Sequence, residues 1–125
     1  MEKKTILIVD DDKSWINILA MRLQSEGYEV RAAFDAVSGM MQTVKERPDL
    51  MILDILMPAG GGFTLLKNLK DNVTTFSLHI IVLSNKADDA TKNQAEKFGI
   101  SGFFPKTIEL AKLMLDIKKI LESRV

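Results

Sequence analysis

The sequence contains no cysteine. Disulfide bonds, zinc sites built on thiolates and a cysteine nucleophile are therefore excluded. It also lacks an apolar stretch that approaches the roughly 20 residues needed to span a bilayer. The short apolar run after the opening "MEKK" ends in acidic residues, whereas a secretory signal ends in a cleavage site of small residues. We therefore expect a cytoplasmic protein without a membrane partner.

The sequence also has no excess of positive or negative charge, because seventeen Lys and Arg residues balance seventeen Asp and Glu residues. Nucleic-acid binding would have no bulk electrostatic driving force, so we expect no direct contact with nucleic acid. The only histidine, His79, precedes an apolar run, where we expect a loop or strand-start role instead of phosphotransfer or metal binding. A chain of 125 residues suffices for one compact core. We expect a single domain over residues 1–125.

Apolar runs of strand length alternate with segments of helical periodicity, which is typical of a parallel sheet covered by helices. The expected strands are 5–9, 28–32, 50–53, 80–83 and 102–104, and the expected helices are 14–26, 36–46, 62–70, 87–98 and 107–123. The second strand alternates apolar and charged residues and the fifth is short, so both are expected at sheet edges. The pattern predicts a doubly wound five-stranded parallel sheet with helices on both faces, in which the first and third strands are neighbours. We expect Asp88 and Thr107 to cap the helices that follow them.

Polar side chains follow the expected strands at the points where they end. Asp10 and Asp11 follow the first strand, Asp54 follows the third, Ser84 the fourth, and Lys106 comes shortly after the fifth. Because a doubly wound sheet binds its ligands outside the carboxyl ends of its strands, these residues are the candidates for a functional site.

The carboxylates that end the first and third strands would lie roughly 5 Å apart, which is one strand spacing. At an effective dielectric constant of about 20, each such pair repels by about 3 kcal/mol, so a cation has to neutralise them. A few hard oxygen ligands suit Mg²⁺. Asp12 has an alternative role as the cap of the first helix. Asp54 interrupts an otherwise apolar run, where an unpaired charge would cost several kcal/mol, so we expect it to face a cation or a polar site.

Four segments of the sequence resemble the receiver domain of two-component response regulators, and are similar to the single-domain chemotaxis and sporulation regulators. They are "ILIVDDD", "PDLMILDILMP", "IIVLS" and "GFFPK", and their order and spacing fit the family over essentially the whole chain. The resemblance implies the flavodoxin-like form of the predicted α/β fold, with strand order 2-1-3-4-5. It also implies a phosphoacceptor function in a two-component or phosphorelay pathway.

By this resemblance Asp54 is the nucleophile that accepts a phosphoryl group from the phosphohistidine of a sensor histidine kinase or histidine phosphotransferase. The expected cofactor is Mg²⁺, or Mn²⁺, held by Asp10, Asp11, Asp54 and the backbone carbonyl of Leu56. Lys106 is expected to balance charge on the phosphoryl oxygens, with Ser84 completing the catalytic set. The domain would catalyse its own phosphorylation and its later autodephosphorylation.

Further residues match the positions that the family uses for switching and for control of phosphate lifetime. Ser84 and Phe103 occupy the switch positions, and an alternative for Phe103 is ordinary packing of an edge strand. Leu56 and Lys86 occupy the positions that tune dephosphorylation. The resemblance further implies that phosphorylation changes the surface of the fourth helix, fifth strand and fifth helix, through which a homodimer, an output domain or a downstream protein would be engaged.

The sequence departs from the family pattern in three places, one of which is Asn85, where a small alanine is usual. Proline precedes Lys106 where family members usually have proline after the lysine, so we expect a trans peptide bond between Lys106 and Thr107. The segment Pro58–Gly62 lacks the acidic residue common in this loop.

Two alternative functions are left open by the sequence. One is a phosphatase of the haloacid-dehalogenase type, with Asp10 as nucleophile and Asp12 as acid. The other is a degenerate receiver that acts only as a protein-interaction module. The sequence also leaves open whether the chain is a complete regulator or part of a larger one, and which kinase it serves.

Overall fold

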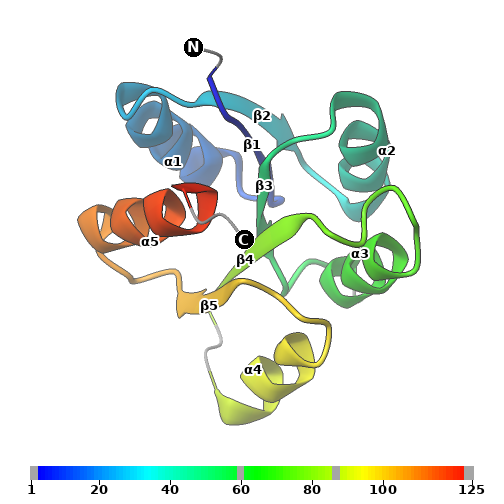
Figure 1. Cartoon of the computed structure of the whole chain (residues 1–125). Coiled ribbons are helices and arrows are strands. Elements are labelled where there is room, and N and C mark those ends of the chain that lie inside the picture. Colours follow the sequence, from blue (N-terminus) through cyan, green and yellow to red (C-terminus); the bar gives the residue numbers. More distant parts are fainter. Residues whose placement is uncertain (1–2, 59–60, 86–87, 123–125) are drawn as a thin grey trace.

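Strands and helices alternate along the whole chain, as the apolar pattern predicts (Figure 1). The computed structural model describes residues 3–58, 61–85 and 88–122. The elements within these ranges are β1 (Thr5–Val9), α1 (Lys13–Ser25), β2 (Glu29–Ala33), α2 (Ala36–Glu46), β3 (Leu50–Asp54), α3 (Gly61–Lys70), β4 (His79–Ser84), α4 (Asp89–Glu96), β5 (Gly102–Pro105) and α5 (Leu110–Glu122). Every expected strand and helix is present, and the boundaries differ from the prediction by at most three residues where the structure describes them.

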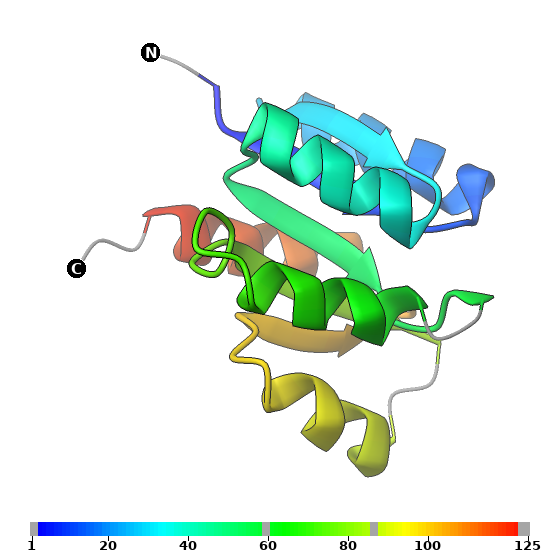
Figure 2. The same ribbon diagram turned by 90° about the vertical axis from the view of Figure 1, so that its right-hand side faces the viewer.

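The strands form one parallel sheet in the order β2-β1-β3-β4-β5. The predicted order is therefore confirmed, with β2 and β5 at the edges. Figure 2 shows the twisted sheet from the side on which α2, α3 and α4 lie. All five carboxyl ends of the strands consequently meet at one edge of the sheet.

Alternating side chains of the central strands pack into two separate cores, one on each face of the sheet. From β1, Ile6 and Ile8 pack with the residues of α1 and α5. Leu7 and Val9 point to the other face, where they pack with α3 and with partly buried residues of α2. Figure 1 shows the same division, with α1 and α5 on one side of the sheet and the remaining helices on the other. Burial on both faces explains why β1, β3 and β4 are almost wholly apolar.

Aspartates begin three of the helices. Asp12, Asp35 and Asp88 each accept a hydrogen bond from the backbone N–H three residues later, which fixes the start of α1, α2 and α4. The predicted cap at Thr107 is wrong, because α5 begins only at Leu110. Residues 105–108 instead form a turn that is closed by a hydrogen bond from the backbone N–H of Ile108 to the carbonyl of Pro105.

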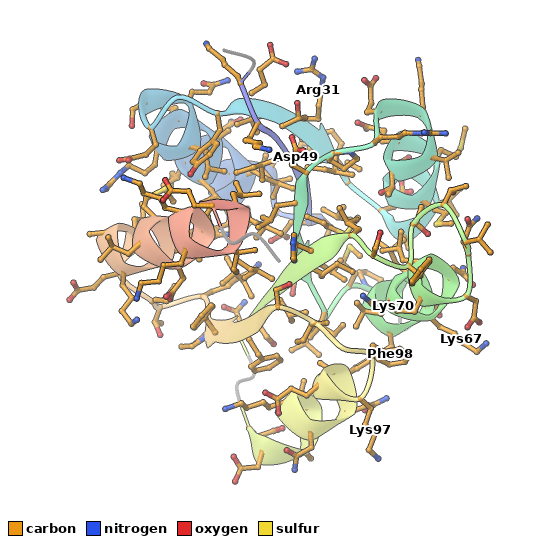
Figure 3. The ribbon with its side chains drawn as sticks, in the orientation of Figure 1. Arg31, Asp49, Lys67, Lys70, Lys97 and Phe98 are labelled. Atoms are coloured by element: carbon orange, nitrogen blue, oxygen red, sulfur yellow. The ribbon has the colours of Figure 1, made fainter. Side chains whose placement is uncertain are left out.

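The amino ends of β1 and β3 are fastened together by a pair of hydrogen bonds. The backbone N–H of Thr5 donates to the carboxylate of Asp49 at 2.8 Å, and the N–H of Asp49 donates to the carbonyl of Thr5 at 2.8 Å. Figure 3 shows Asp49 at the entry to β3, and Lys67 and Lys70 on α3. This link fixes the alignment of the two strands whose opposite ends carry the candidate site.

None of the helices within the described ranges is both long enough and apolar enough to cross a membrane.

Candidate functional site

The parallel pairing of β1 with β3 brings two acidic strand ends together. Val9 is aligned with Leu53, so Asp10 and Asp54 follow at the same level of the sheet. Both carboxylates are buried. The backbone N–H of Asp10 donates to the carbonyl of Ala33, which ties the end of β1 to the end of β2.

Three of the aspartates singled out in the sequence form one cluster. Asp10, Asp11 and Asp54 can each present a carboxylate oxygen within 4.8 Å of those of the other two. Asp11 is exposed, whereas the other two are buried. The cluster therefore opens to solvent on the side of Asp11.

Each buried carboxylate is held by the backbone that follows it. The N–H of Asp12 donates to Oδ1 of Asp10 at 2.9 Å, and the N–H of Leu56 donates to Oδ1 of Asp54 at 3.0 Å. These bonds fix the orientation of the two side chains. The Oδ2 atoms of both remain directed to the interior of the site, where they meet a cation.

That cation is the ammonium group of Lys106. Its Nζ lies 2.7 Å from Oδ2 of Asp10 and 3.3 Å from Oδ2 of Asp54. The turn after β5 positions this side chain, since the backbone N–H of Lys106 donates to the carbonyl of Ser84 at 3.0 Å. The Lys106–Thr107 peptide bond is trans, as expected from the position of the proline. The reversed order of proline and lysine therefore does not prevent Lys106 from reaching the aspartates.

The ionisation of Asp10 and Lys106 reflects this shared environment. Burial raises the pKa of Asp10, and the charge of Asp54 adds to the increase, although the hydrogen bonds from Lys106 and from the N–H of Asp12 oppose it. Burial by itself lowers the pKa of Lys106, but the hydrogen bond to Asp10 and the charges of both aspartates outweigh burial and raise it overall. Lys106 is therefore protonated, and one positive charge faces three carboxyl groups.

Ser84 and Phe103, the predicted switch residues, lie on the neighbouring strands β4 and β5. Ser84 is fully buried at the end of β4, where it is aligned with Pro105 of β5. Phe103 is partly buried and packs against the core between the sheet and α2–α4. In this structure Phe103 therefore packs as an ordinary residue of an edge strand would, which is the alternative to its predicted switch role.

The family resemblance predicts that Leu56 and Lys86 tune the lifetime of the phosphoryl group. Leu56 follows Asp54 by two positions and its side chain is 44% exposed, so it stands at the solvent side of the site. Lys86 lies outside the described residues.

Two residues near the site have roles that sequence reasoning did not identify. The ring of Trp15 on α1 lies 5.9 Å from Nζ of Lys106, at the limit of a cation–π contact. A side chain on Gly62 would collide with the backbone carbonyl of Ile55. Only glycine there allows α3 to start so close to the end of β3. The signal for this in the sequence is the run of three glycines, but the run alone does not show which of the three positions requires glycine.

The comparisons with known proteins agree with this geometry. The family model for the response regulator receiver domain matches residues 6–118. The chain belongs to this family. Among solved structures, a putative response regulator from Chloroflexus aurantiacus superposes on this receiver domain with a TM-score of 0.91 at 33% identity, covering 98% of this chain and 100% of the other. A CheY-like receiver domain protein from Methanospirillum hungatei gives a TM-score of 0.89 at 27% identity, covering 97% and 95%.

Curated relatives of this receiver domain are longer proteins. The response regulator PleD of Caulobacter vibrioides is 30% identical over 96% of this chain and 26% of its own length. The phosphate regulon transcriptional regulatory protein PhoB of Pseudomonas aeruginosa is 31% identical over 97% of this chain and 53% of its own length. The chain thus spans about a quarter to a half of these relatives. The comparisons give no support to the haloacid-dehalogenase alternative, and Asp12, its expected acid, is the cap of α1.

Replacing Lys106 by methionine tests the charge balance of the receiver site. Without the ammonium group, the buried carboxylates of Asp10 and Asp54 are left uncompensated, so we expect the free energy of unfolding to fall by about 3–5 kcal/mol in metal-free buffer. Urea denaturation, monitored by circular dichroism, measures this free energy of unfolding. Lys112→Met, which removes an exposed pair with Asp116, is the matched control and should change stability by less than about 1 kcal/mol. Equal losses for the two variants would contradict the assignment of Lys106 as the balancing charge.

Proposed function

We propose that this receiver domain is a phosphoacceptor in which Asp54 receives a phosphoryl group from the phosphohistidine of a sensor histidine kinase or histidine phosphotransferase. The observation that carries the proposal is the environment of Asp54. Its carboxylate is buried at the end of β3, beside the carboxylates of Asp10 and Asp11 and 3.3 Å from the ammonium of Lys106. The proposed unit is the whole chain, residues 1–125, working as one domain.

The donor set of the acidic cluster fits a small divalent cation. Three carboxyl groups and one ammonium group leave the cluster negative, and all donors are hard oxygens, which Mg²⁺ and Mn²⁺ prefer. Asp10, Asp11 and Asp54, with the backbone carbonyl of Leu56, are the residues that we propose as ligands. When bound, the cation would neutralise charge on the phosphoryl oxygens during transfer.

The side chains of the domain perform the transfer itself. A carboxylate oxygen of Asp54 attacks phosphorus, and the new oxygen–phosphorus bond forms as the phosphorus–nitrogen bond to the donor imidazole breaks. The contact with Asp10 holds the ammonium group of Lys106 within reach of Asp54. There it pairs with a phosphoryl oxygen and stabilises the negative charge on that oxygen during transfer. Water later hydrolyses the acyl phosphate, which regenerates Asp54 and releases phosphate.

The signal would pass from the site to the surface of α4, β5 and α5. The hydroxyl of Ser84 moves toward the new phosphoryl oxygens and Phe103 becomes more deeply buried, which changes the packing of β5 with its neighbouring helices. This surface would engage an output domain of the same polypeptide, a separate downstream protein or a second phosphorylated copy. A cytoplasmic location is part of the proposal, because phosphohistidine donors of two-component systems are cytoplasmic.

Leu56 and Lys86 are proposed to set the lifetime of the acyl phosphate. The side chain of Leu56 stands at the solvent side of Asp54, where an apolar group hinders the approach of water. Lys86 would pair with an outer phosphoryl oxygen. Together they would slow autodephosphorylation.

Incubation with acetyl phosphate and Mg²⁺ tests the phosphoacceptor proposal. The wild-type protein should gain the mass of one phosphoryl group, as measured by intact-protein mass spectrometry, and Asp54→Asn should gain none because an amide is not a nucleophile here. Asp71→Asn, which alters an exposed aspartate paired with Lys67, is the control and should label like the wild type. Labelling that persists in Asp54→Asn, or no labelling of the wild-type protein, would overturn the proposal in favour of a degenerate receiver or a different nucleophile.

Calorimetric titration with Mg²⁺ tests the proposed ligands. Asp11→Ala removes the exposed carboxylate of the cluster and should weaken Mg²⁺ binding at least about tenfold, or ~1.4 kcal/mol. Asp71→Ala removes an equal charge just after the carboxyl end of α3 and should leave the affinity unchanged. An unaltered dissociation constant for Asp11→Ala would remove Asp11 from the ligand set.

Replacing Leu56 by asparagine tests the control of phosphate lifetime. A polar side chain at the mouth of the site should admit and orient water, so we expect faster loss of the phosphoryl group, by about tenfold, than in the wild-type protein. The decay of the labelled fraction by mass spectrometry gives the rate. If the rate is the same in both proteins, Leu56 does not shield the acyl phosphate.

A further inference from the structure

Lys106 supplies the positive charge of the proposed site from the end of a long, flexible side chain. A free lysine side chain samples many rotamers, and fixing it in one of them costs entropy. Here the side chain is only 10% exposed, and its ammonium group is fixed against Asp10 and Asp54. The residue that follows is Thr107, so no proline restricts the backbone of Lys106. The restraint on this side chain therefore comes from the residues packed around it.

One of these residues is Trp15, in the first turn of α1. The centroid of its ring lies 5.9 Å from Nζ of Lys106, within the range in which the face of an indole attracts an ammonium group. Among the described residues, no other aromatic ring lies within this range of Lys106. Trp15 is partly buried and packs against the core between the sheet, α1 and α5. The core thus holds the ring beside the ammonium group.

The same short segment of the chain carries both Trp15 and Asp10. The backbone N–H of Asp12 donates to Oδ1 of Asp10 at 2.9 Å, and the N–H of Trp15 donates to Oδ1 of Asp12 at 3.1 Å. These two hydrogen bonds join the end of β1 to the first turn of α1. Lys106 arrives from β5 and is met by a carboxylate and an aromatic ring that are fixed relative to each other.

The contacts of Lys106 with carboxylates and with the ring differ in what happens to them during phosphoryl transfer. One oxygen of Asp54 becomes bonded to phosphorus, and the ammonium group pairs with a phosphoryl oxygen, so the contacts between charged groups are exchanged. The ring of Trp15 takes no part in this exchange. It is neutral, so it attracts the ammonium group without adding a negative charge that would compete with the phosphoryl oxygens.

We propose that Trp15 is a positioning residue of the phosphoacceptor site, whose ring keeps the ammonium group of Lys106 at the acidic cluster. The inference rests on the function proposed above and adds a residue to the set that serves it. In this role Trp15 contacts neither the phosphoryl group nor the divalent cation and acts only through Lys106. Its loss therefore slows phosphoryl transfer and leaves the binding of Mg²⁺ unchanged.

Core packing alone would place different demands on position 15. A residue that only fills space beside α5 tolerates leucine at least as well as phenylalanine, and its replacement changes stability instead of the rate of transfer. A residue that holds an ammonium group needs an aromatic face, which phenylalanine keeps and leucine lacks. Tyr28 offers a matched comparison, because it is a partly buried aromatic residue of the same core that lies just before β2, at the opposite edge of the sheet.

The rate of labelling by acetyl phosphate and Mg²⁺, followed by intact-protein mass spectrometry, tests this role. Trp15→Leu should be labelled about fivefold more slowly than the wild-type protein, and Trp15→Phe should stay within about twofold of it. Tyr28→Leu should be labelled like the wild type. Calorimetric titration should give the same dissociation constant for Mg²⁺ in all four proteins.

Three results would overturn the role of Trp15. They are labelling of Trp15→Leu as fast as the wild type, labelling of Trp15→Phe as slow as that of Trp15→Leu, and weaker Mg²⁺ binding by Trp15→Leu, which would show that the acidic cluster itself is disturbed. A wild-type protein that is not labelled at all would instead refute the phosphoacceptor proposal.

Fluorescence tests the contact between Trp15 and Lys106 without any phosphoryl donor, since Trp15 is the only tryptophan of the chain. A protonated amine beside an indole ring quenches its emission. Lys106→Met should therefore emit more strongly than the wild-type protein, with circular dichroism confirming that both are folded. Lys112→Met, which removes an exposed lysine of α5, should emit like the wild type. Equal emission from all three proteins would show that the ammonium group does not lie at the ring and would overturn the proposal.

Discussion

The mutual repulsion of two buried carboxylates is the constraint around which this molecule is arranged. Asp10 and Asp54 lie at adjacent strand ends because β1 pairs with β3 in parallel, and the hydrogen bonds between Thr5 and Asp49 set the alignment from the opposite end. Left alone, such a pair would destabilise the fold by several kcal/mol. Lys106 offsets this repulsion by contacting both carboxylates.

The packing of the rest of the sheet keeps the mutually repelling carboxylates together. Central strands buried on both faces hold the backbone rigidly, so the strand ends cannot separate to relieve the repulsion. The backbone N–H groups of Asp12 and Leu56 add fixed donors to the two buried carboxylates. A negative and partly open cluster of hard oxygen donors suits a small divalent cation, which would balance charge in the phosphoryl transfer that we propose for Asp54.

The proposed site and helix α2 lie in different parts of the molecule. The edge formed by the carboxyl ends of the strands holds the residues of the proposed phosphoacceptor site, while α2 contains none of them. Gly39 and Gly62 show how closely α2 and α3 approach the sheet, since a side chain at either position would meet neighbouring atoms. The inner side of α2 thus packs in the core, whereas Val37, Met41 and Val44 on its outer side are exposed.

The sequence by itself determined the alternation of strands and helices, the edge positions of β2 and β5, and the set of polar residues at the strand ends. It could do so because burial on both faces demands continuous apolar runs, and because an aspartate within such a run has to meet a cation. Only the tertiary structure decided that Lys106 reaches both Asp10 and Asp54 despite the displaced proline, that α5 begins after Thr107, and that Trp15 lies near the ammonium group. It also decided which apolar residues of α2 remain uncovered. These features depend on contacts between segments distant in the chain, and no local pattern records which side of a helix its neighbours will cover.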